Sequence, residues 1–428
     1  MSVSGLRIFI PLLFLVILYF SQRYWVRAAR RTIASMRRPG WRAALRVLWS
    51  AFGVLLLLAV VVRFAAFGAN AWPSPLVSRW SSEFLGLWFT WSIFGFLAIG
   101  AVRGIAWIAN KSVVLPRNSR GRSAKVTDSP SDPQRRYFLR TATLAAGALP
   151  LAGALYGFAV ERFDFKVYRV DVPVPGLPYG LDGLRILQLS DVHASNYMPI
   201  TQVRRMVDKA EKLNFEIIMI TGDLLTGQGD PLAACVAELG RLRAPLGTWG
   251  CNGNHEIYTH TQEEAAQLFR QHGMTMLRQE NEQLTRRGAK FNLIGVDYQR
   301  QHWVAEDNRP MLEGVEGLVR PDMPNILLSH NPNAFVRSSE LGIDLMLAGH
   351  THGGQVEVEI LDHRISPARF ITKYIAGLYR RPMGREATSP FGKRYASAYV
   401  SRGLGTIGTP LRLGVPPEIS LLTLRRAG

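Results

Sequence analysis

The chain of 428 residues carries 51 Lys and Arg against 32 Asp and Glu, and 47% of its residues are hydrophobic. This length leaves room for more than one domain, and the composition excludes a disordered or collagen-like chain. With only Cys235 and Cys251, the sequence also excludes a disulfide-stapled scaffold and a cysteine-based zinc module.

The positive charge is concentrated in the N-terminal part of the chain. Residues 1–160 hold 20 basic against three acidic residues, a net charge of +17, whereas residues 161–428 hold 31 against 29, a net charge of +2. A nucleic-acid-binding domain would gather such charge on one folded face. Here the charge lies between apolar runs, so we expect no nucleic-acid partner.

Four apolar runs occupy the N-terminal third, each close to the ~20 residues that a helix needs to cross a bilayer. They lie at about 2–22, 47–67, 84–102 and 141–160. Core helices of a soluble protein would need polar positions for an aqueous face, which these runs almost lack. We therefore expect a membrane domain with about four transmembrane helices over 1–160, a linker over 161–180 and a second domain over 181–428.

The loops between these runs predict the orientation in the membrane. Residues 23–46 hold eight Arg and no acid, and residues 111–140 hold eight Lys or Arg against two Asp. By the positive-inside rule both loops are cytoplasmic, so the fourth helix leads the rest of the chain out of the cytoplasm. We expect a multi-pass protein of the cell (inner) membrane, with its C-terminal domain on the outer, periplasmic side.

The segment before the fourth run resembles a twin-arginine export signal. It reads Gln134-Arg135-Arg136-Tyr137-Phe138-Leu139-Arg140 and precedes a mildly apolar stretch rich in Ala and Gly. Arg pairs also occur at 30–31 and 37–38, so an Arg-rich loop can contain one by chance. The Phe-Leu-Arg triplet favours export of a folded domain, with the twin-arginine translocase as a partner and an uncleaved anchor.

From about residue 165, short β-rich runs end abruptly in polar residues. Five apolar strands share this design: Leu184–Ser190, Phe215–Thr221, Leu246–Asn252, Asn325–Ser329 and Asp344–Ala348. Strands that are apolar throughout fit an α/β fold in which helices cover the sheet, and 200–213 and 262–272 have the pattern of such helices. The carboxyl ends of these strands are where α/β folds build their sites.

The strand ends supply imidazole, carboxylate and amide groups. The candidates are Asp191, His193, Asp223, Asn254, His255, His330, His350 and His352. A single His is most often an ordinary surface or core group, but five such clusters on strand ends are hard to explain in that way. This set of donors, without thiolate, suits Mn²⁺, Fe or Zn²⁺.

In chain order the motifs read Asp-x-His, Gly-Asp-Leu, Gly-Asn-His-Glu, a lone His and Gly-His-Thr-His. This order resembles that of the calcineurin-like metallophosphoesterases, and the resemblance covers about 180–425. The segments Gly349–Gln355 and Pro416–Ile419 resemble the membrane-associated bacterial branch of that superfamily. The resemblance implies a four-layer αββα sandwich, preceded here by the transmembrane helices, and two divalent metal ions.

The resemblance also implies a metal-binding role for seven residues. The first metal ion is expected on the side chains of Asp191, His193 and His352. The second is expected on the side chains of Asn254, His330 and His350. The carboxylate of Asp223 would bridge the two ions.

Three further residues have implied or candidate roles. His255 would face the leaving group as a general acid and would not bind a metal ion. Glu256 stands where Asp is commoner and would support the site from behind. Arg402 is a candidate for contact with a substrate phosphate, and a structural salt bridge is the alternative.

Two divalent ions activate a bridging water and neutralise phosphoryl charge. We therefore expect a membrane-anchored phosphohydrolase, a phosphodiesterase, in which a metal-bridging hydroxide attacks phosphorus. A phospholipid or lipid-linked phosphodiester is the natural substrate class beside a membrane, and a soluble nucleotide or phosphomonoester is the alternative.

Two other functions stay open at this point. One is a non-catalytic sensor of a phosphorylated ligand, which the complete set of ligand residues disfavours. The other is a cytoplasm-facing hydrolase of a UDP-linked lipid pyrophosphate, which the placement of the Arg residues disfavours.

Overall fold

The computed structural model describes residues 3–68, 75–112, 133–299, 311–360, 363–366, 372–383 and 395–427. The chain forms two compact units, Met1–Tyr156 and Gly157–Gly428.

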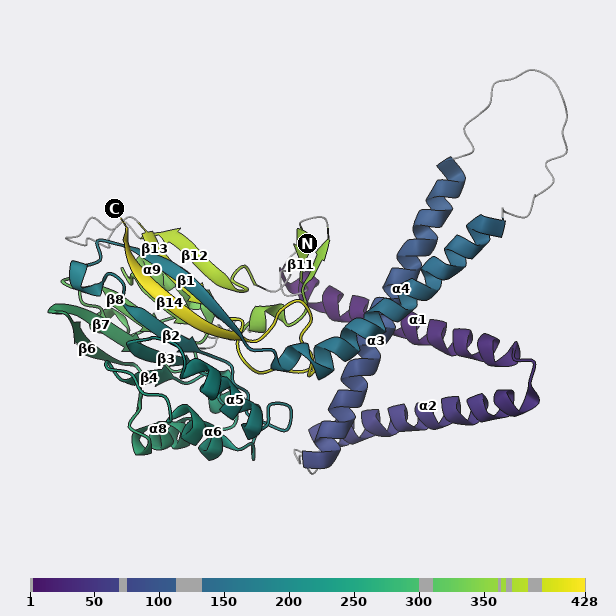
Figure 1. Cartoon of the computed structure of the whole chain (residues 1–428), viewed down its shortest axis with the longest axis horizontal. Helices are drawn as coiled ribbons and strands as arrows, with labels where there is room; N and C mark the ends of the chain where they lie inside the picture. The colour runs from purple at the N-terminus through teal and green to yellow at the C-terminus, as the bar shows by residue number, and fades with distance from the viewer. Residues whose placement is uncertain are drawn as a thin grey trace, which may run out of the picture. The chain divides into compact units, whose positions relative to one another are not determined.

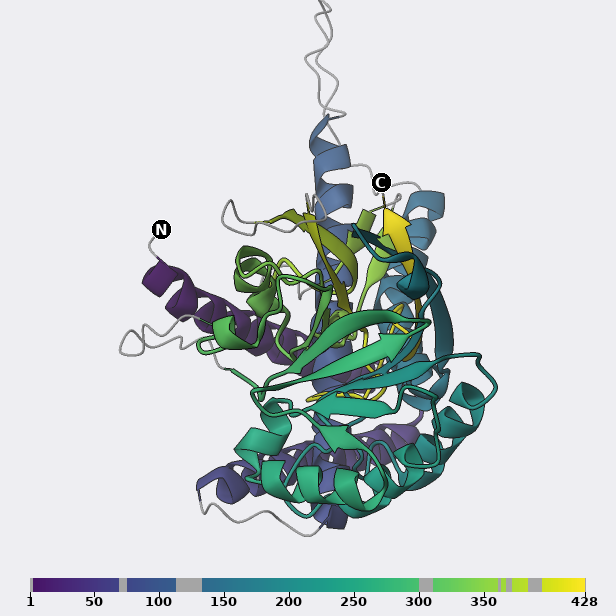
Figure 2. The same cartoon turned by 90° about the vertical axis from the view of Figure 1, so that its left-hand side faces the viewer.

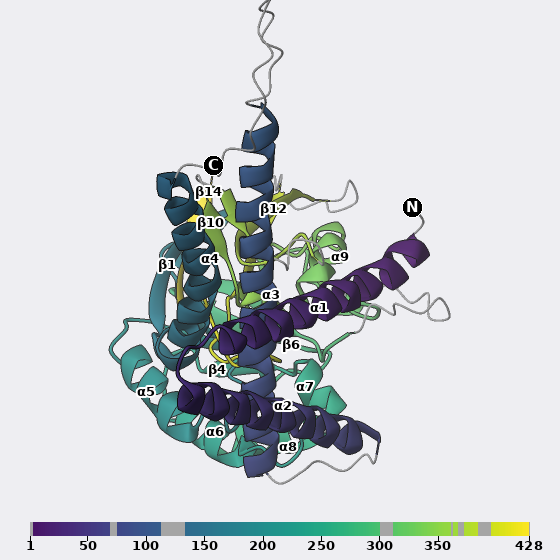
Figure 3. The same cartoon turned by 90° about the vertical axis from the view of Figure 1, so that its right-hand side faces the viewer.

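Long helices make up the first unit. They are α1 (Val3–Ala34), α2 (Pro39–Gly68), α3 (Pro75–Ser112) and α4 (Pro133–Ala159), the last of which continues into the second unit. Helix α3 packs against both α1 and α2, and Figure 3 shows how these two cross it. The segment that resembles a twin-arginine signal lies in the first turns of α4.

Three stretches of the described helices are long and apolar enough to cross a membrane: Pro39–Val62, Phe84–Ile108 and Thr141–Phe163. They coincide with three of the four predicted spans, so the predicted count of four is corrected to three candidates in the described part of the chain. The remaining prediction, at about 2–22, falls on α1, whose side chains are described only from residue 12 on. There an apolar stretch soon gives way to Gln22 and Arg23, which lower the hydropathy of the helix.

A polar network joins α1 to α3 within the first unit. The Ser21 hydroxyl and the Trp25 indole both donate to the carbonyl of Ser92, at 2.8 Å each. The Gln22 amide donates to the Ser92 hydroxyl at 2.9 Å and accepts from the Trp88 indole at 2.8 Å. Such hydrogen bonds hold helices together in an apolar setting, where lipid offers no polar partner.

The second unit is built on two mixed sheets of six strands each. The first has the order β1-β14-β2-β3-β4-β5 (Figure 1). Its strands are β1 (Lys166–Pro175), β14 (Glu418–Ala427), β2 (Arg185–Leu189), β3 (Ile217–Thr221), β4 (Thr248–Cys251) and β5 (Thr275–Met276). Strands β2 to β5 run parallel, so their carboxyl ends lie at one edge.

The second sheet has the order β12-β13-β9-β8-β7-β6, and Figure 2 views the unit from the side of β6 and β7. Its strands are β12 (Gly377–Pro382), β13 (Tyr395–Val400), β9 (Leu345–Ala348), β8 (Asn325–Leu328), β7 (Ala289–Gly295) and β6 (Glu280–Arg286). The central strands β7, β8, β9 and β13 run parallel. A separate hairpin pairs β10 (Val358–Ile360) with β11 (His363–Ile365).

Alternating side chains of the first sheet enter two different cores. Along β3, Ile218 and Ile220 belong to a core shared with α5 (Ile200–Ala210), α6 (Leu232–Leu239) and α8 (Gln262–Gln271), which lie together along this sheet (Figure 1). Ile217 and Met219 enter a second core, which contains residues of β7, β8 and β9 from the other sheet. The strands are therefore apolar on both faces because both faces are covered.

On the second sheet, α9 (Phe335–Glu340) packs near β12 and β13. The structure confirms the predicted α/β fold with two sheets. The full four-layer arrangement stays a prediction.

Residues 161–180, predicted as a linker, contribute a strand to the first sheet. Strand β1 pairs in parallel with the last strand, β14, from Lys166 opposite Glu418 to Pro175 opposite Ala427. The paired strand begins only a few residues after α4 ends.

Candidate metal centre

The predicted ligand residues lie at strand ends of both sheets. Asp191 and His193 follow β2, Asp223 follows β3, and Asn254 and His255 begin α7 (Asn254–Tyr258) after β4. From the second sheet, His330 follows β8, and His350 and His352 follow β9. All of these side chains meet in one place because the parallel strands of each sheet end at the same edge.

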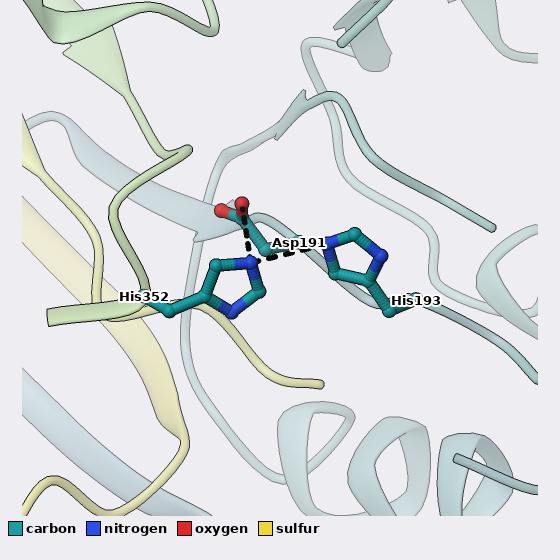
Figure 4. Close-up of side chains that lie close together, drawn as sticks. All are labelled: Asp191, His193 and His352. Carbon is teal, nitrogen blue, oxygen red and sulfur yellow. Dashed lines mark hydrogen bonds and ion pairs between the residues drawn. The ribbon is translucent and has the colours of Figure 1, made fainter. Parts of the chain in front are cut away.

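The first group of donors consists of Asp191, His193 and His352, all buried (Figure 4). The Nε2 atoms of the two imidazoles lie 3.1 Å apart. Nε2 of His352 also lies 3.4 Å from Oδ1 of Asp191. The group takes two residues from the first sheet and one from the second.

The second group consists of Asp223, His330 and His350. Oδ2 of Asp223 lies 3.1 Å from Nε2 of His330 and 3.4 Å from Nε2 of His193, so this carboxylate faces both groups. Oδ1 of Asn254 lies 2.8 Å from Nδ1 of His350. The structure thus brings all seven predicted metal ligands together.

The chemistry of these donors fits divalent cations. Among the described residues, the fully buried Nε2 of His330 makes no hydrogen bond of good geometry, although Oδ2 of Asp223 lies 3.1 Å from it. Two imidazole nitrogens that face each other cannot both donate, and buried carboxylates beside them need a positive partner. A cation among these atoms would satisfy each of them, and this donor set is one that Zn²⁺, Mn²⁺ or Fe accepts.

The electrostatics are those of a tightly packed set of charges. Burial alone would raise the pKa of Asp223, but His330 and His193 hold it well below its ordinary range. Burial would lower the pKa of His330, but the carboxylates of Asp223 and Asp191 outweigh it and raise that pKa to about 10. Burial lowers the pKa of His350 to about 4, assisted by the charge of His330.

The backbone at the site is locally strained. Five of the candidate ligands adopt a left-handed conformation: Asp191, His193, Asp223, His350 and His352, with φ between 49° and 74°. This region disfavours residues with a Cβ, and such strain clusters at functional sites where the surroundings impose it. The glycines of the motifs allow the close packing, since a Cβ on Gly253 would overlap the Asp223 carboxylate and one on Gly349 the Asp191 carboxylate.

Contacts from behind orient the imidazole rings. Nδ1 of His330 lies 2.6 Å from the Thr221 carbonyl, and Nδ1 of His255 lies 2.6 Å from the Thr226 carbonyl. A ring that donates from Nδ1 to a carbonyl turns Nε2 toward the site, where this atom can bind a cation when it is unprotonated or donate a proton when it is protonated. Thr226 also places its hydroxyl 3.2 Å from Nδ1 of His193.

Glu256 supports two loops of the site at once. Its fully buried carboxylate accepts hydrogen bonds from the backbone N–H groups of Asp223 (2.9 Å), Leu224 (2.7 Å) and Gly253 (2.7 Å). These donors belong to the loops that follow β3 and β4, so the carboxylate ties the two loops together.

His255 lies within the same cluster as the ligands. One of its nitrogens is close enough to His193 and Asp223 for the three to hold an ion in common, and its ring centroid lies 4.7 Å from that of His193. The structure therefore places His255 at the site. This position is compatible with either role, a metal ligand or a general acid. The ring of Tyr258 lies beside that of His255, and the ring of Tyr298 lies beside that of His350.

Arg402 is engaged with groups of the protein itself. Its guanidinium forms an ion pair with Glu418 at 2.8 Å and stacks over the ring of Tyr168. This is the structural alternative considered for Arg402, and its contact with a substrate phosphate stays a prediction.

The sequence analysis missed Arg412, which is fully buried behind the site. Its Nη2 lies 3.5 Å from Nδ1 of His352. Burial lowers the pKa of Arg412 to about 10, against the opposing effect of Asp191, so the guanidinium stays charged at neutral pH. Its position in a loop without a metal-ligand motif gave no signal in the sequence.

Comparison with known proteins adds evidence on the family. Residues 184–354 match the family of calcineurin-like phosphoesterases. The chain is 33% identical, over 61% of its length, to a bovine "Transmembrane protein with metallophosphoesterase domain", of which it covers 57%. It is 29% identical to the "Uncharacterized metallophosphoesterase YkuE" of Bacillus subtilis, over 68% of this chain and 97% of that protein.

A third relative is named for an activity. The chain is 26% identical to the "Phosphodiesterase YaeI" of Escherichia coli, over 56% of this chain and 82% of that protein. The chain spans less than two thirds of the bovine relative. Together with the clustered donors, the matched segment and the relatives' names support a place for the second unit in the calcineurin-like metallophosphoesterase superfamily, as a metal-dependent phosphoesterase.

Proposed function

We propose that the chain is a membrane-anchored phosphodiesterase that works with two divalent cations. The observation that carries this proposal is the pair of donor groups that share the Asp223 carboxylate. Asp191, His193 and His352 would hold one cation, and Asn254, His330 and His350 the other. Cations held there would activate a water molecule and neutralise charge on the phosphoryl oxygens.

The side chains of the protein would complete the reaction. Nδ1 of His255 is held against the Thr226 carbonyl, which leaves Nε2 free to give a proton to the departing oxygen. Burial lowers the pKa of His255, so its imidazolium is a stronger acid than a solvated one. The buried Glu256 carboxylate would keep Asp223 and the Asn254 loop in register while charge develops.

The test is hydrolysis by the full chain in detergent with Mn²⁺, using bis-p-nitrophenyl phosphate and p-nitrophenyl phosphate side by side. We expect faster turnover of the diester, and a loss of about 10²- to 10⁴-fold in His255→Ala if this residue is the acid. Turnover that prefers the monoester would replace the diesterase proposal with a phosphatase. An unchanged rate in His255→Ala would remove the general-acid role.

The same proposal extends to location. We propose that α4 anchors the enzyme and that the second unit lies on the outer side of a bacterial inner membrane, exported by the twin-arginine translocase. The basic loops and the Arg135-Arg136 pair support this, and a lipid-linked phosphodiester is the substrate class that an anchored site would meet. Protease added outside spheroplasts should cleave the second unit of the wild type, and a double Arg-to-Lys change at 135–136 should protect it. Cleavage that is equal in both would remove the translocase from the proposal.

A further inference from the structure

One loop, from Arg402 to Val415, packs directly behind the first group of donors. The N–H of Gly405 donates to the Asp191 carbonyl at 2.7 Å, and the N–H of Leu404 donates to the Ser190 carbonyl at 3.0 Å. The approach is so close that a Cβ on Gly405 would overlap the Val192 carbonyl. The loop therefore sets where the backbone of the strained Asp-x-His motif can lie.

Arg412 holds this loop in shape from its other side. Its guanidinium donates to three carbonyls: Nε to Gly405 at 3.0 Å, Nη2 to Arg402 at 2.9 Å and Nη1 to Val415 at 3.2 Å. The backbone of Gly405 thus lies between Asp191, whose carbonyl accepts from the Gly405 N–H, and Arg412, which donates to the Gly405 carbonyl. These three hydrogen bonds of Arg412 all go to this loop. In addition, Nη2 of Arg412 lies 3.5 Å from Nδ1 of His352.

We propose that Arg412 is a positioning residue for the group formed by Asp191, His193 and His352, and that it acts through the backbone of Gly405. The inference rests on the proposed function, because it concerns the affinity of the same site for metal. Asp191 and His193 both adopt left-handed backbone conformations, which persist only where the surroundings enforce them. A guanidinium that fixes three carbonyls behind them supplies that constraint.

The backbone of Arg412 is held in turn by the end of α4. The Arg412 N–H donates to the Gly157 carbonyl at 3.2 Å, and a Cβ on Gly157 would overlap the Arg412 carbonyl. A larger side chain at Gly157 would therefore move the Arg412 loop without removing the guanidinium. This gives a second perturbation that is independent of the charge of Arg412.

The test is a Mn²⁺-binding isotherm of the full chain in detergent, measured by equilibrium dialysis. The wild type should bind two Mn²⁺ per chain. Arg412→Met should lose at least 10-fold in affinity at one site and leave the other unchanged. Arg412→Lys should behave like Arg412→Met, because one ammonium cannot bridge three carbonyls. If the wild type binds no Mn²⁺, the proposed function fails, whatever Arg412 does.

Two backgrounds identify the affected site. In His330→Ala, which keeps only the first group intact, Arg412→Met should remove the remaining Mn²⁺. In His352→Ala, the same change should have no further effect. An isotherm that Arg412→Met leaves unchanged, an equal weakening of both sites, or an effect that persists in His352→Ala would overturn the inference.

Gly157→Val tests the same positioning role if the Arg412 variants do not fold. It should show the same selective loss of one Mn²⁺ site. The matched control is Gly317→Val, since a Cβ built on Gly317 meets no described residue within 4 Å beyond its immediate neighbours in the chain, and this variant should bind two Mn²⁺. A folded Gly157→Val protein with the wild-type isotherm would contradict the proposed role of the loop.

Discussion

The Glu256 carboxylate accepts hydrogen bonds from both loops that carry Asp223 and Asn254, which makes Glu256→Gln a direct perturbation of both. Oε2 accepts from the N–H groups of Asp223 and Gly253, and Oε1 accepts from that of Leu224. A Gln side chain keeps one acceptor oxygen and turns an NH₂ group toward a backbone N–H. The best orientation therefore loses the bond to Leu224 and sets two donors against each other.

The magnitude follows from these contacts. A hydrogen bond to a charged group contributes about 1.5–3 kcal/mol, and a buried donor left unpaired costs about 1–3 kcal/mol. We expect Glu256→Gln to cost about 2–4 kcal/mol, which lowers the melting temperature of a unit this size by roughly 4–16 °C. Because the variant loosens the Asp223 loop, Mn²⁺ affinity should also fall by about 10- to 100-fold.

The assay compares thermal unfolding of the metal-free chain with Mn²⁺ binding by dialysis. Glu238→Gln is a matched control, because Glu238 is also buried but pairs with Arg204 and Arg241 away from the site. That variant should lower stability and leave Mn²⁺ affinity unchanged. A Glu256→Gln protein that binds Mn²⁺ like the wild type would refute the reasoning about the two loops.

Two further outcomes are expected. Gly349→Ala should cost about 1–3 kcal/mol of stability and weaken Mn²⁺ binding, because the added Cβ would overlap the Asp191 carboxylate. Equal Mn²⁺ affinity of the wild type and the variant would contradict this prediction, because it would show that the loop around Gly349 can move to make room. Glu216→Gln should destabilise the second unit by about 1.5–3 kcal/mol near neutral pH, because it removes the charged partner of the buried Arg286 at 2.9 Å. Burial would raise the pKa of Glu216, but Arg286 holds it below its ordinary value of 4.5, so the stabilisation is present above that pH and lost as the pH falls through the folded-state pKa. The difference in melting temperature between wild type and Glu216→Gln should therefore shrink as the pH falls below about 4.5, and a constant difference would contradict the assignment.

The strands that carry the site could be predicted because their signal is local. The predicted run Asn325–Ser329 corresponds to β8 (Asn325–Leu328), and Asp344–Ala348 to β9 (Leu345–Ala348). Each is an apolar stretch that ends where a ligand residue begins. The covering helices were similarly local, as 262–272 corresponds to α8 (Gln262–Gln271).

The assignment of strands to the two sheets could not be predicted from such local signals. Nothing in the strand that precedes Asp223 shows that it belongs to a different sheet from the strand that precedes His350, since both are continuously apolar. The pairing of β1 with β14 joins residues about 250 positions apart, and a contact of that range leaves no local pattern. For this reason a strand was predicted as a linker.

The supporting residues were only partly predictable. Glu256 was expected to support the site because it stands inside a ligand motif, and its three hydrogen bonds agree with that role. Arg412 lies 60 positions after His352 in a loop with no motif of its own, and its role depends on how that loop folds back. Its fully buried guanidinium became visible only with the structure.

The Asp223 carboxylate faces both donor groups, so the most direct test of the proposed centre is the number of Mn²⁺ ions bound by the full chain before and after Asp223→Asn. We expect two per chain in the wild type and fewer than one in the variant at the same free Mn²⁺ concentration, with hydrolysis of bis-p-nitrophenyl phosphate lost in parallel. Two Mn²⁺ retained by Asp223→Asn, or none bound by the wild type, would contradict the proposed centre.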